Sequence, residues 1–211
     1  TASLAFGGLY GGNPTTAVTE SWNGTNWTEV NDLNTARARL GGAGTQTSAL
    51  AISGYTTTHV GNTESWNGTN WTEVNDINTA RYALAGVGVD NTSALAFGGY
   101  DTESKSSAET WNGTNWADTG DMNTARNSLG GAGNRTSALA FGGSGPPQTT
   151  NTEDFNGASW TEVNNLNTSR ESLAGLGTTT AGLAFGGEVP PPSTATEEWN
   201  VPSNTVKTLT D

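Results

Sequence analysis

One seven-residue phrase recurs five times in the chain, and this repeat constrains the fold more than any other feature. It reads SWNGTNW from Ser21 and from Ser65, TWNGTNW from Thr110, DFNGASW from Asp154 and EWNVPSN from Glu198. Successive copies lie 44 or 45 residues apart. A unit of this length cannot bury its apolar face alone, so we expect neighbouring units to cover one another.

Two further landmarks have the same period. A small apolar run ending in glycine, LAFGG or LAISG, occurs five times, whereas Asn-Thr-Ala-Arg or Asn-Thr-Ser-Arg occurs four times. The first unit is the one without the arginine segment. We therefore divide a single domain, 1–211, into units at about 1–33, 34–77, 78–122, 123–166 and 167–211.

Each unit contains four short segments separated by turn residues, which predicts four antiparallel strands. We label them a to d in chain order: the stretch after the arginine, the SALAFGG type, TESW and NWTEV. An Asn-Gly pair between c and d favours a hairpin turn, because both residues tolerate positive φ. Glycine, threonine and asparagine abound and no helical period persists, so we expect an all-β fold.

Sheets of this size cover both faces when they are arranged radially, which predicts a five-bladed β-propeller with four-stranded blades. Repeated glycine in segment a favours close backbone approach, so strand a is expected innermost. Because the chain starts inside a b segment, the first blade lacks its inner strand in this sequence. An unpaired inner edge invites strand addition, from a terminal extension of the chain or from a neighbouring subunit.

Aromatic residues on the two sides of each c–d turn are expected to pack between adjacent blades. The arginine after Asn-Thr either lines the channel and holds an anion or, as we favour, bonds loop carbonyls or a neighbouring blade's aspartate. These structural repeat positions are Trp22, Trp27, Arg37, Trp66, Trp71, Arg81, Trp111, Trp116, Arg126, Phe155, Trp160, Arg170 and Trp199.

This ordered set resembles the kelch repeat: an arginine, a small apolar strand ending in glycine, an aromatic and a tryptophan five residues later. The second unit carries it through Arg37, Gly54, Trp66 and Trp71. The resemblance implies strand a at the channel and strand d at the rim. The chain departs from it at Ser53, at Asn204 in place of a tryptophan, and in having only five units.

Charge and composition exclude several functions. Twenty acidic against eight basic residues give a net charge of −12, so we expect no nucleic-acid partner. No cysteine and one histidine leave no thiolate or multi-histidine metal site, and we expect no metal and no cofactor. No apolar stretch reaches the ~18 residues of a membrane span, so no membrane insertion is expected. By analogy, the acidic, lysine-poor composition favours an extracellular or virion location.

Repeated carboxylates give weak signals of chemistry. One glutamate precedes the c-segment aromatic in every unit, and such periodic placement favours a structural or solvated role over catalysis. Asp32, Asp76, Asp121 and Asn165 lie in the d-to-a connections, where we favour solvated turn residues over a cation site. The repeated glutamates are Glu20, Glu64, Glu109, Glu153 and Glu197.

Function is expected on the loops between b and c, which differ completely between units while the c–d turns hardly change. Drift at tolerant surface loops is an equally weighted explanation. We expect no enzyme but a binding or assembly module, a virion structural or secreted adhesion protein with protein or subunit partners. A glycan-binding propeller is the alternative, and an enzyme using the central channel is less favoured. The candidate binding residues, with His59 taken as a loop residue, are Tyr10, Tyr55, His59, Tyr100, Lys105, Gln148 and Glu188.

Overall fold

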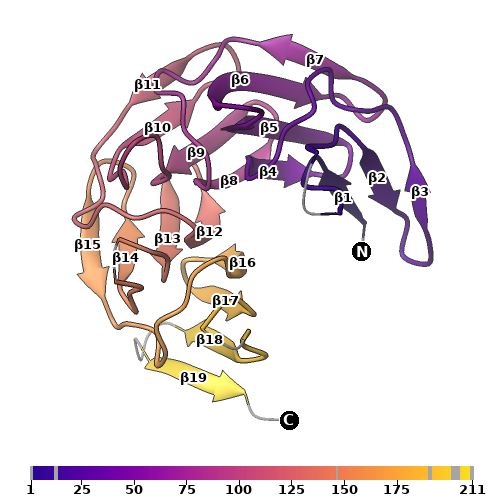
Figure 1. Cartoon of the computed structure of the whole chain (residues 1–211). Coiled ribbons are helices and arrows are strands. Elements are labelled where there is room, and N and C mark those ends of the chain that lie inside the picture. The colour runs from indigo at the N-terminus through magenta and orange to yellow at the C-terminus, as the bar shows by residue number, and fades with distance from the viewer. Residues whose placement is uncertain (1, 12–13, 146, 190–191, 201–204, 210–211) are drawn as a thin grey trace.

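Each repeat unit folds into one antiparallel sheet, and the five sheets stand around a common axis as the blades of a β-propeller (Figure 1). The computed structural model describes residues 2–11, 14–145, 147–189 and 192–200, and the backbone of 205–209. Within these residues the chain forms strands and no helix, so no helix long enough to cross a membrane is present there. The all-β, five-bladed prediction is confirmed.

The first blade has three strands and the other four blades have four, as the count of a segments predicts. Blade 1 consists of β1 (Ser3–Phe6), β2 (Thr19–Trp22) and β3 (Trp27–Glu29). Blade 2 consists of β4 (Gly41–Thr45), β5 (Ser48–Tyr55), β6 (His59–Trp66) and β7 (Trp71–Val74). Blade 3 consists of β8 (Ala85–Asp90), β9 (Ser93–Phe97), β10 (Ala108–Trp111) and β11 (Trp116–Asp118).

Blades 4 and 5 repeat the same order from the axis outward. Blade 4 consists of β12 (Gly130–Asn134), β13 (Ser137–Phe141), β14 (Thr152–Phe155) and β15 (Trp160–Val163). Blade 5 consists of β16 (Ala174–Thr178), β17 (Ala181–Phe185), β18 (Thr196–Asn200) and β19 (Thr205–Leu209). Asn204, expected where other units have a tryptophan, lies outside the described residues.

The glycine-rich strands β4, β8, β12 and β16 lie at the axis and contact one another in that order. A Cβ built on Gly86 would lie 2.9 Å from the carbonyl oxygen of Gly42 in the preceding blade. Glycine is therefore required where the inner strands approach each other most closely. The prediction that strand a is innermost is confirmed.

Adjacent blades pack through two complementary faces. On blade 2, Leu50 and Ile52 point toward the next blade, where Ala94, Ala96 and Trp111 receive them. The junctions of blades 1 and 2 and of blades 3 and 4 repeat this arrangement of large side chains against alanines and an aromatic pair, whereas the junction of blades 4 and 5 has Ala184 and the single Trp199. The second tryptophans of blades 2 to 4, Trp71, Trp116 and Trp160, are only 5–6% exposed. For these blades the predicted packing between blades is confirmed.

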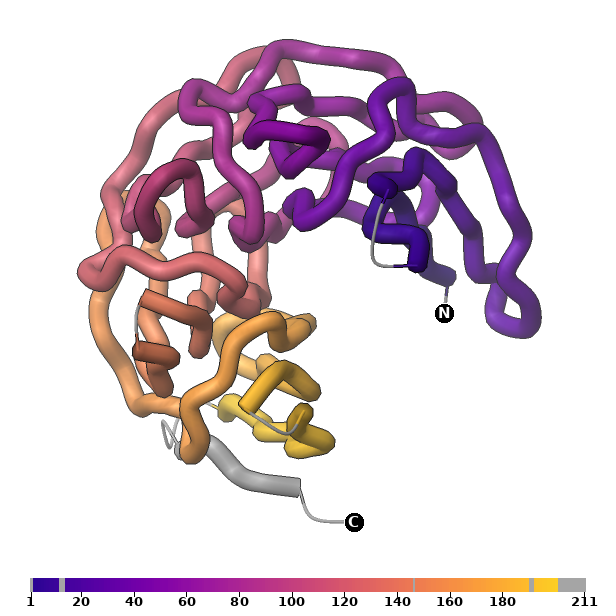
Figure 2. Tube along the Cα trace, viewed as in Figure 1, coloured from indigo at the N-terminus to yellow at the C-terminus, as the bar shows by residue number. Residues whose placement is uncertain are grey.

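Blade 1 departs from this prediction, because no neighbouring blade covers the face that carries Trp22 and Trp27. Trp27 is 48% exposed, and its partner Trp22 is half-buried. At the other end of the chain Leu176 is 51% exposed on β16. Figures 1 and 2 show blades 1 and 5 at the two ends of an open arc. The expectation that every aromatic pair lies between blades is wrong for Trp22 and Trp27.

The repeated arginines are buried structural residues. The expected hydrogen bonds to carbonyl oxygens are present, for example from Arg81 to Gly98 and from Arg126 to Gly142, but the acidic partner is not the expected aspartate. Each pairs with the glutamate of strand c in its own blade rather than with a neighbouring blade's aspartate. The N···O distance is 3.2 Å for Arg37–Glu64 and 2.6 Å for Arg81–Glu109. Burial lowers the pKa of Arg37, and the Glu64 carboxylate opposes that shift. The other two pairs are Arg126–Glu153 and Arg170–Glu197, both at 2.8 Å.

The d-to-a connections hold the start of strand c by short polar contacts. The Oδ1 atoms of Asp32 and Asn165 accept the backbone N–H groups of Thr19 and Thr152 at 3.1 and 2.9 Å. Within the described part of the chain, no three His, Asp or Glu side chains lie close enough to share an ion. These side chains therefore have a local structural explanation.

Candidate functional site

Strand alternation places the b–c loops and the d-to-a connections on one face of the propeller, which we call the loop face. Paired backbone hydrogen bonds join the two kinds of connection. Ala38 and Tyr55 exchange N–H···O bonds at 2.9 Å, and Tyr82 and Tyr100 do so at 3.0 and 2.8 Å. Residues that directly follow the repeated arginine are thereby fixed beside the variable loops.

Three tyrosines form a row across the junction of blades 2 and 3. The rings of Tyr55 and Tyr82 lie 5.4 Å apart between centroids, and those of Tyr82 and Tyr100 lie 5.5 Å apart. The Arg39 guanidinium lies 5.6 Å from the centre of the Tyr82 ring. Tyr55 is exposed, and the other two tyrosines are half-buried. The row is therefore an aromatic surface with a cation beside its middle ring.

Toward the axis, backbone hydrogen bonds link the blades around the loop face. The N–H of Ala83 donates to Arg39, that of Ser128 to Ala83 and that of Ser172 to Ser128, each at 2.7 Å. The four residues have φ between 53° and 55°, a strained conformation for non-glycine residues. The repeated bond explains why they hold it, because it fixes each blade to the preceding one.

These residues border a depression of about 500 Å³ on the loop face. Polar side chains converge there from three blades. The Gln148 Nε2 donates to Glu171 Oε1 at 3.1 Å and to the Glu188 carbonyl oxygen at 3.2 Å. The Asn127 Nδ2 donates to Ser104 Oγ at 2.9 Å. The lining includes Arg39, Asn127, Ser128, Glu171, Ser172 and Glu188.

The structure brings some of the sequence-predicted residues together and separates others. Tyr55 and Tyr100 share the tyrosine row through Tyr82. Glu188 lines the depression, and Gln148 donates to its carbonyl oxygen. His59 is not a loop residue: it begins β6 and pairs with Tyr55, because β5 and β6 extend further than the other b and c strands.

Two of the candidate binding residues, Lys105 and Tyr10, belong neither to the tyrosine row nor to the lining of the depression. Lys105 forms ion pairs with Asp101 and Glu103 at 3.1 and 3.2 Å, and its hydrogen bonds to both raise its pKa. It closes its own loop in this way. Tyr10 is 77% exposed, and its N–H donates to the Pro14 carbonyl oxygen. Among the described residues its ring has no aromatic partner.

Sequence reasoning missed the residues that come directly after the repeated arginines. Of these, Tyr82, Asn127 and Glu171 belong to the site, and Arg39 lies one position further along. The position after the arginine reads Ala, Tyr, Asn and Glu in successive units, within an otherwise uniform segment. That variation was the available signal.

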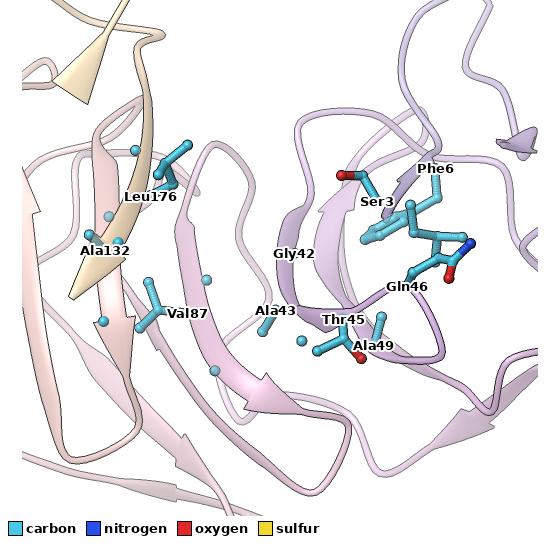
Figure 3. Close-up of a pocket in the computed structure, with 18 of the residues that line it drawn as sticks. Ser3, Phe6, Gly42, Ala43, Thr45, Gln46, Ala49, Val87, Ala132 and Leu176 are labelled. Carbon is cyan, nitrogen blue, oxygen red and sulfur yellow. The ribbon is translucent and has the colours of Figure 1, made fainter. Parts of the chain in front are cut away.

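A second hollow, the central groove, lies among the inner strands and has a volume of about 480 Å³ (Figure 3). Ser3 and Phe6 of β1 line it on one side, and Gly42 and Ala43 of β4 lie next to them. The described lining residues carry no ionisable side chain. Most of the lining is glycine, alanine and other uncharged residues, so the groove offers backbone groups and neutral side chains to an occupant.

Comparison with known proteins adds no assignment. A scan of the chain against protein-family models finds no match, and a search of curated proteins finds none either. A functional assignment therefore depends on the geometry of the loop face and the central groove.

Proposed function

We propose that this protein is a non-enzymatic binding module of kelch-like repeats, with its ligand site on the loop face. The observation that carries the proposal is the tyrosine row beside a polar depression. The tyrosines and the polar residues of the depression stand at positions that vary between units, on a scaffold whose turns and inner strands are nearly constant. Variable groups on a rigid frame are a common basis of recognition.

The ligand class that these groups suit best is a glycan. Tyrosine rings offer apolar faces of the size of a sugar ring, and the amide, guanidinium and carboxylate groups of Asn127, Arg39 and Glu171 complement hydroxyl groups. We further propose a location outside a cell or on a virion, which the acidic, lysine-poor composition supports by analogy. An enzyme acting through the central groove finds no support in that groove's lining.

A glycan array probed with the purified chain tests this proposal. Binding should be lost in Tyr82→Ala, which removes the middle of the row, and kept in Tyr10→Ala, an exposed tyrosine outside it. Both variants should melt within a few degrees of the parent. If no glycan on the array is bound, the glycan proposal is wrong. If both variants bind equally well, the tyrosine row is not the binding site.

Assembly through the end faces is a second candidate function. Trp27 on blade 1 and Leu176 on blade 5 are about half exposed, whereas the equivalent residues of inner blades are buried. Exposed apolar faces of this kind favour association. Sedimentation over a range of concentrations should then show self-association that Trp27→Ser weakens. A concentration-independent monomer would remove this candidate.

A further inference from the structure

Glu20 in β2 is the only repeated strand-c glutamate of the described residues without its arginine. Its equivalents Glu64, Glu109, Glu153 and Glu197 are 1–2% exposed and ion-paired. Glu20 is exposed, and no described residue hydrogen-bonds or ion-pairs with its side chain. The four glutamates that have an arginine partner therefore show which contacts Glu20 lacks.

The missing group is a whole segment rather than one side chain. In blade 2, Glu64 accepts hydrogen bonds from the N–H and Nδ2 of Asn34 at 2.7 and 2.8 Å and from the N–H of Thr35 at 3.3 Å. The arginine of the same segment completes the set. Blades 3 and 4 repeat the backbone bonds from Asn and Thr to Glu109 and Glu153. All the donors in each blade come from one Asn-Thr-x-Arg sequence.

The backbone beside Glu20 is incomplete in the same place. β1 pairs with β2 alone, whereas the second strand of every other blade also pairs with an inner strand. The central groove, which is lined by β1 and by the inner strands β4, β8, β12 and β16, borders this free edge (Figure 3). The N–H of Arg39 finds no acceptor among the described residues, while the equivalent N–H groups of blades 3 to 5 each bond to the preceding blade.

We propose that the inner edge of blade 1 binds an extended segment with the pattern Asn-Thr-x-Arg, two residues, then Leu-Gly-Gly-Ala-Gly. The donated arginine pairs with Glu20, and the strand adds to the inner edge of β1. This inference deepens the proposed function, since it rests on a binding or assembly role and names the partner's chemistry.

The occupied blades also predict the register and the need for small residues. In blade 2, Gly41 lies opposite Ile52 and Ala43 opposite Leu50. The corresponding residues of β1 are Phe6 and Leu4, so the donated glycine and alanine are expected opposite them. Larger residues would collide with the neighbouring inner strand, as a Cβ on Gly86 does with Gly42.

The four Asn-Thr-x-Arg segments within residues 1–211 are not free to act as the donor. Each is bound to the glutamate of its own blade, and the strand that follows each segment is paired. Releasing one would expose a buried arginine and a buried glutamate. The donor therefore carries a free segment of the same chemistry.

The test uses the full chain and a synthetic peptide with the sequence of residues 34–45, NTARARLGGAGT. Calorimetry should show one site, with affinity at least tenfold weaker for the peptide whose fourth residue is changed from Arg to Ala. Glu20→Gln should weaken binding similarly, while Glu162→Gln, at an exposed glutamate of β15, should leave it unchanged. Glu20 is exposed in the free chain, so this variant should melt normally.

Hydrogen exchange then locates the peptide. Protection should rise at β1 and at Arg39 and stay constant at β19. No binding, or equal binding by the Arg→Ala peptide, would overturn the proposal, as would dimerisation of the chain in place of peptide binding. Tyr82→Ala should bind the peptide normally, so failure of the glycan site and failure of this site are distinguishable.

Discussion

At the scale of single residues, the repeated arginine and glutamate show how a periodic charge is accommodated inside a small β-protein. The four guanidinium groups are fully buried, and each donates to at least one backbone carbonyl oxygen besides pairing with its carboxylate. Arg126, for example, donates to the carbonyl oxygens of Gly142 and Asn151 at 2.9 and 2.6 Å. The pair thereby links strand c to the loop face.

Removing one partner of such a pair should be costly. Arg126→Met leaves Glu153 buried without its cation, and we expect the free energy of unfolding to fall by about 3–5 kcal/mol. The double variant Arg126→Met/Glu153→Leu should recover part of that loss, because no unpaired charge remains. Urea denaturation of the three proteins measures both effects. A double variant no more stable than the single one would contradict this explanation.

Trp71 and Trp27 occupy equivalent positions in blades 2 and 1 but differ in burial, so they can be compared directly. Trp71→Ala should lower the free energy of unfolding by about 3–5 kcal/mol, because its ring packs against Phe6 and its Nε1 donates to Thr19 at 3.0 Å. Trp27→Ala, at the equivalent position of blade 1, should cost much less because that ring is 48% exposed. Thermal and chemical unfolding report the difference. Equal losses would indicate that blade 1 is covered in solution.

At the scale of elements, the short distance between neighbouring inner strands limits the size of the side chains they can carry. Glycine recurs in β4, β8, β12 and β16 because adjacent inner strands come close at the axis. In the c–d hairpins, by contrast, the turn's own backbone conformation determines which residue is allowed. Gly24, Gly68, Gly113 and Gly157 have φ between 92° and 99°, as their Asn-Gly turns predict.

A methyl group should therefore be tolerated differently in different strands. Gly86→Ala in β8 places its Cβ 2.9 Å from a backbone oxygen of β4, and we expect a loss of about 1–3 kcal/mol. Gly61→Ala in β6 meets its nearest atom at 3.3 Å and should cost less. Denaturant titrations of both variants provide the measurement. A larger loss at Gly61 would show that axial crowding does not set the limit.

At the scale of the whole molecule, five blades form an arc in which each is covered only by its neighbours. Blades 2 to 4 have a neighbour on both faces, and blades 1 and 5 have one uncovered face each. In repeat architectures stability is close to a sum of unit and junction contributions. The end blades should therefore be the least stable parts of the chain.

Native-state hydrogen exchange should show this gradient. Amide groups in β1 to β3 should exchange faster than those in β8 to β11, because blade 1 has three strands and one covered face. Adding the peptide of residues 34–45 should slow exchange in blade 1 toward the rate of blade 3. Uniform exchange across the five blades would contradict the additive view.

The sequence by itself determined the features that depend on local geometry and on counting. Period, strand order, hairpin turns, the innermost strand and the three-stranded first blade follow from residue patterns within one unit. Four residues of the proposed ligand site, Tyr55, Tyr100, Gln148 and Glu188, could also be predicted, because they lie in the segments that vary between units.

Only the tertiary structure decided which residues from different units meet. It showed that Tyr82 joins two loop tyrosines, that Arg37 pairs with Glu64, and that Trp27 is exposed. These facts depend on the blade-to-blade rotation and on which faces have neighbours. The sequence pattern of a unit is the same whether or not another blade covers it, so the pattern does not show which blade faces are left uncovered.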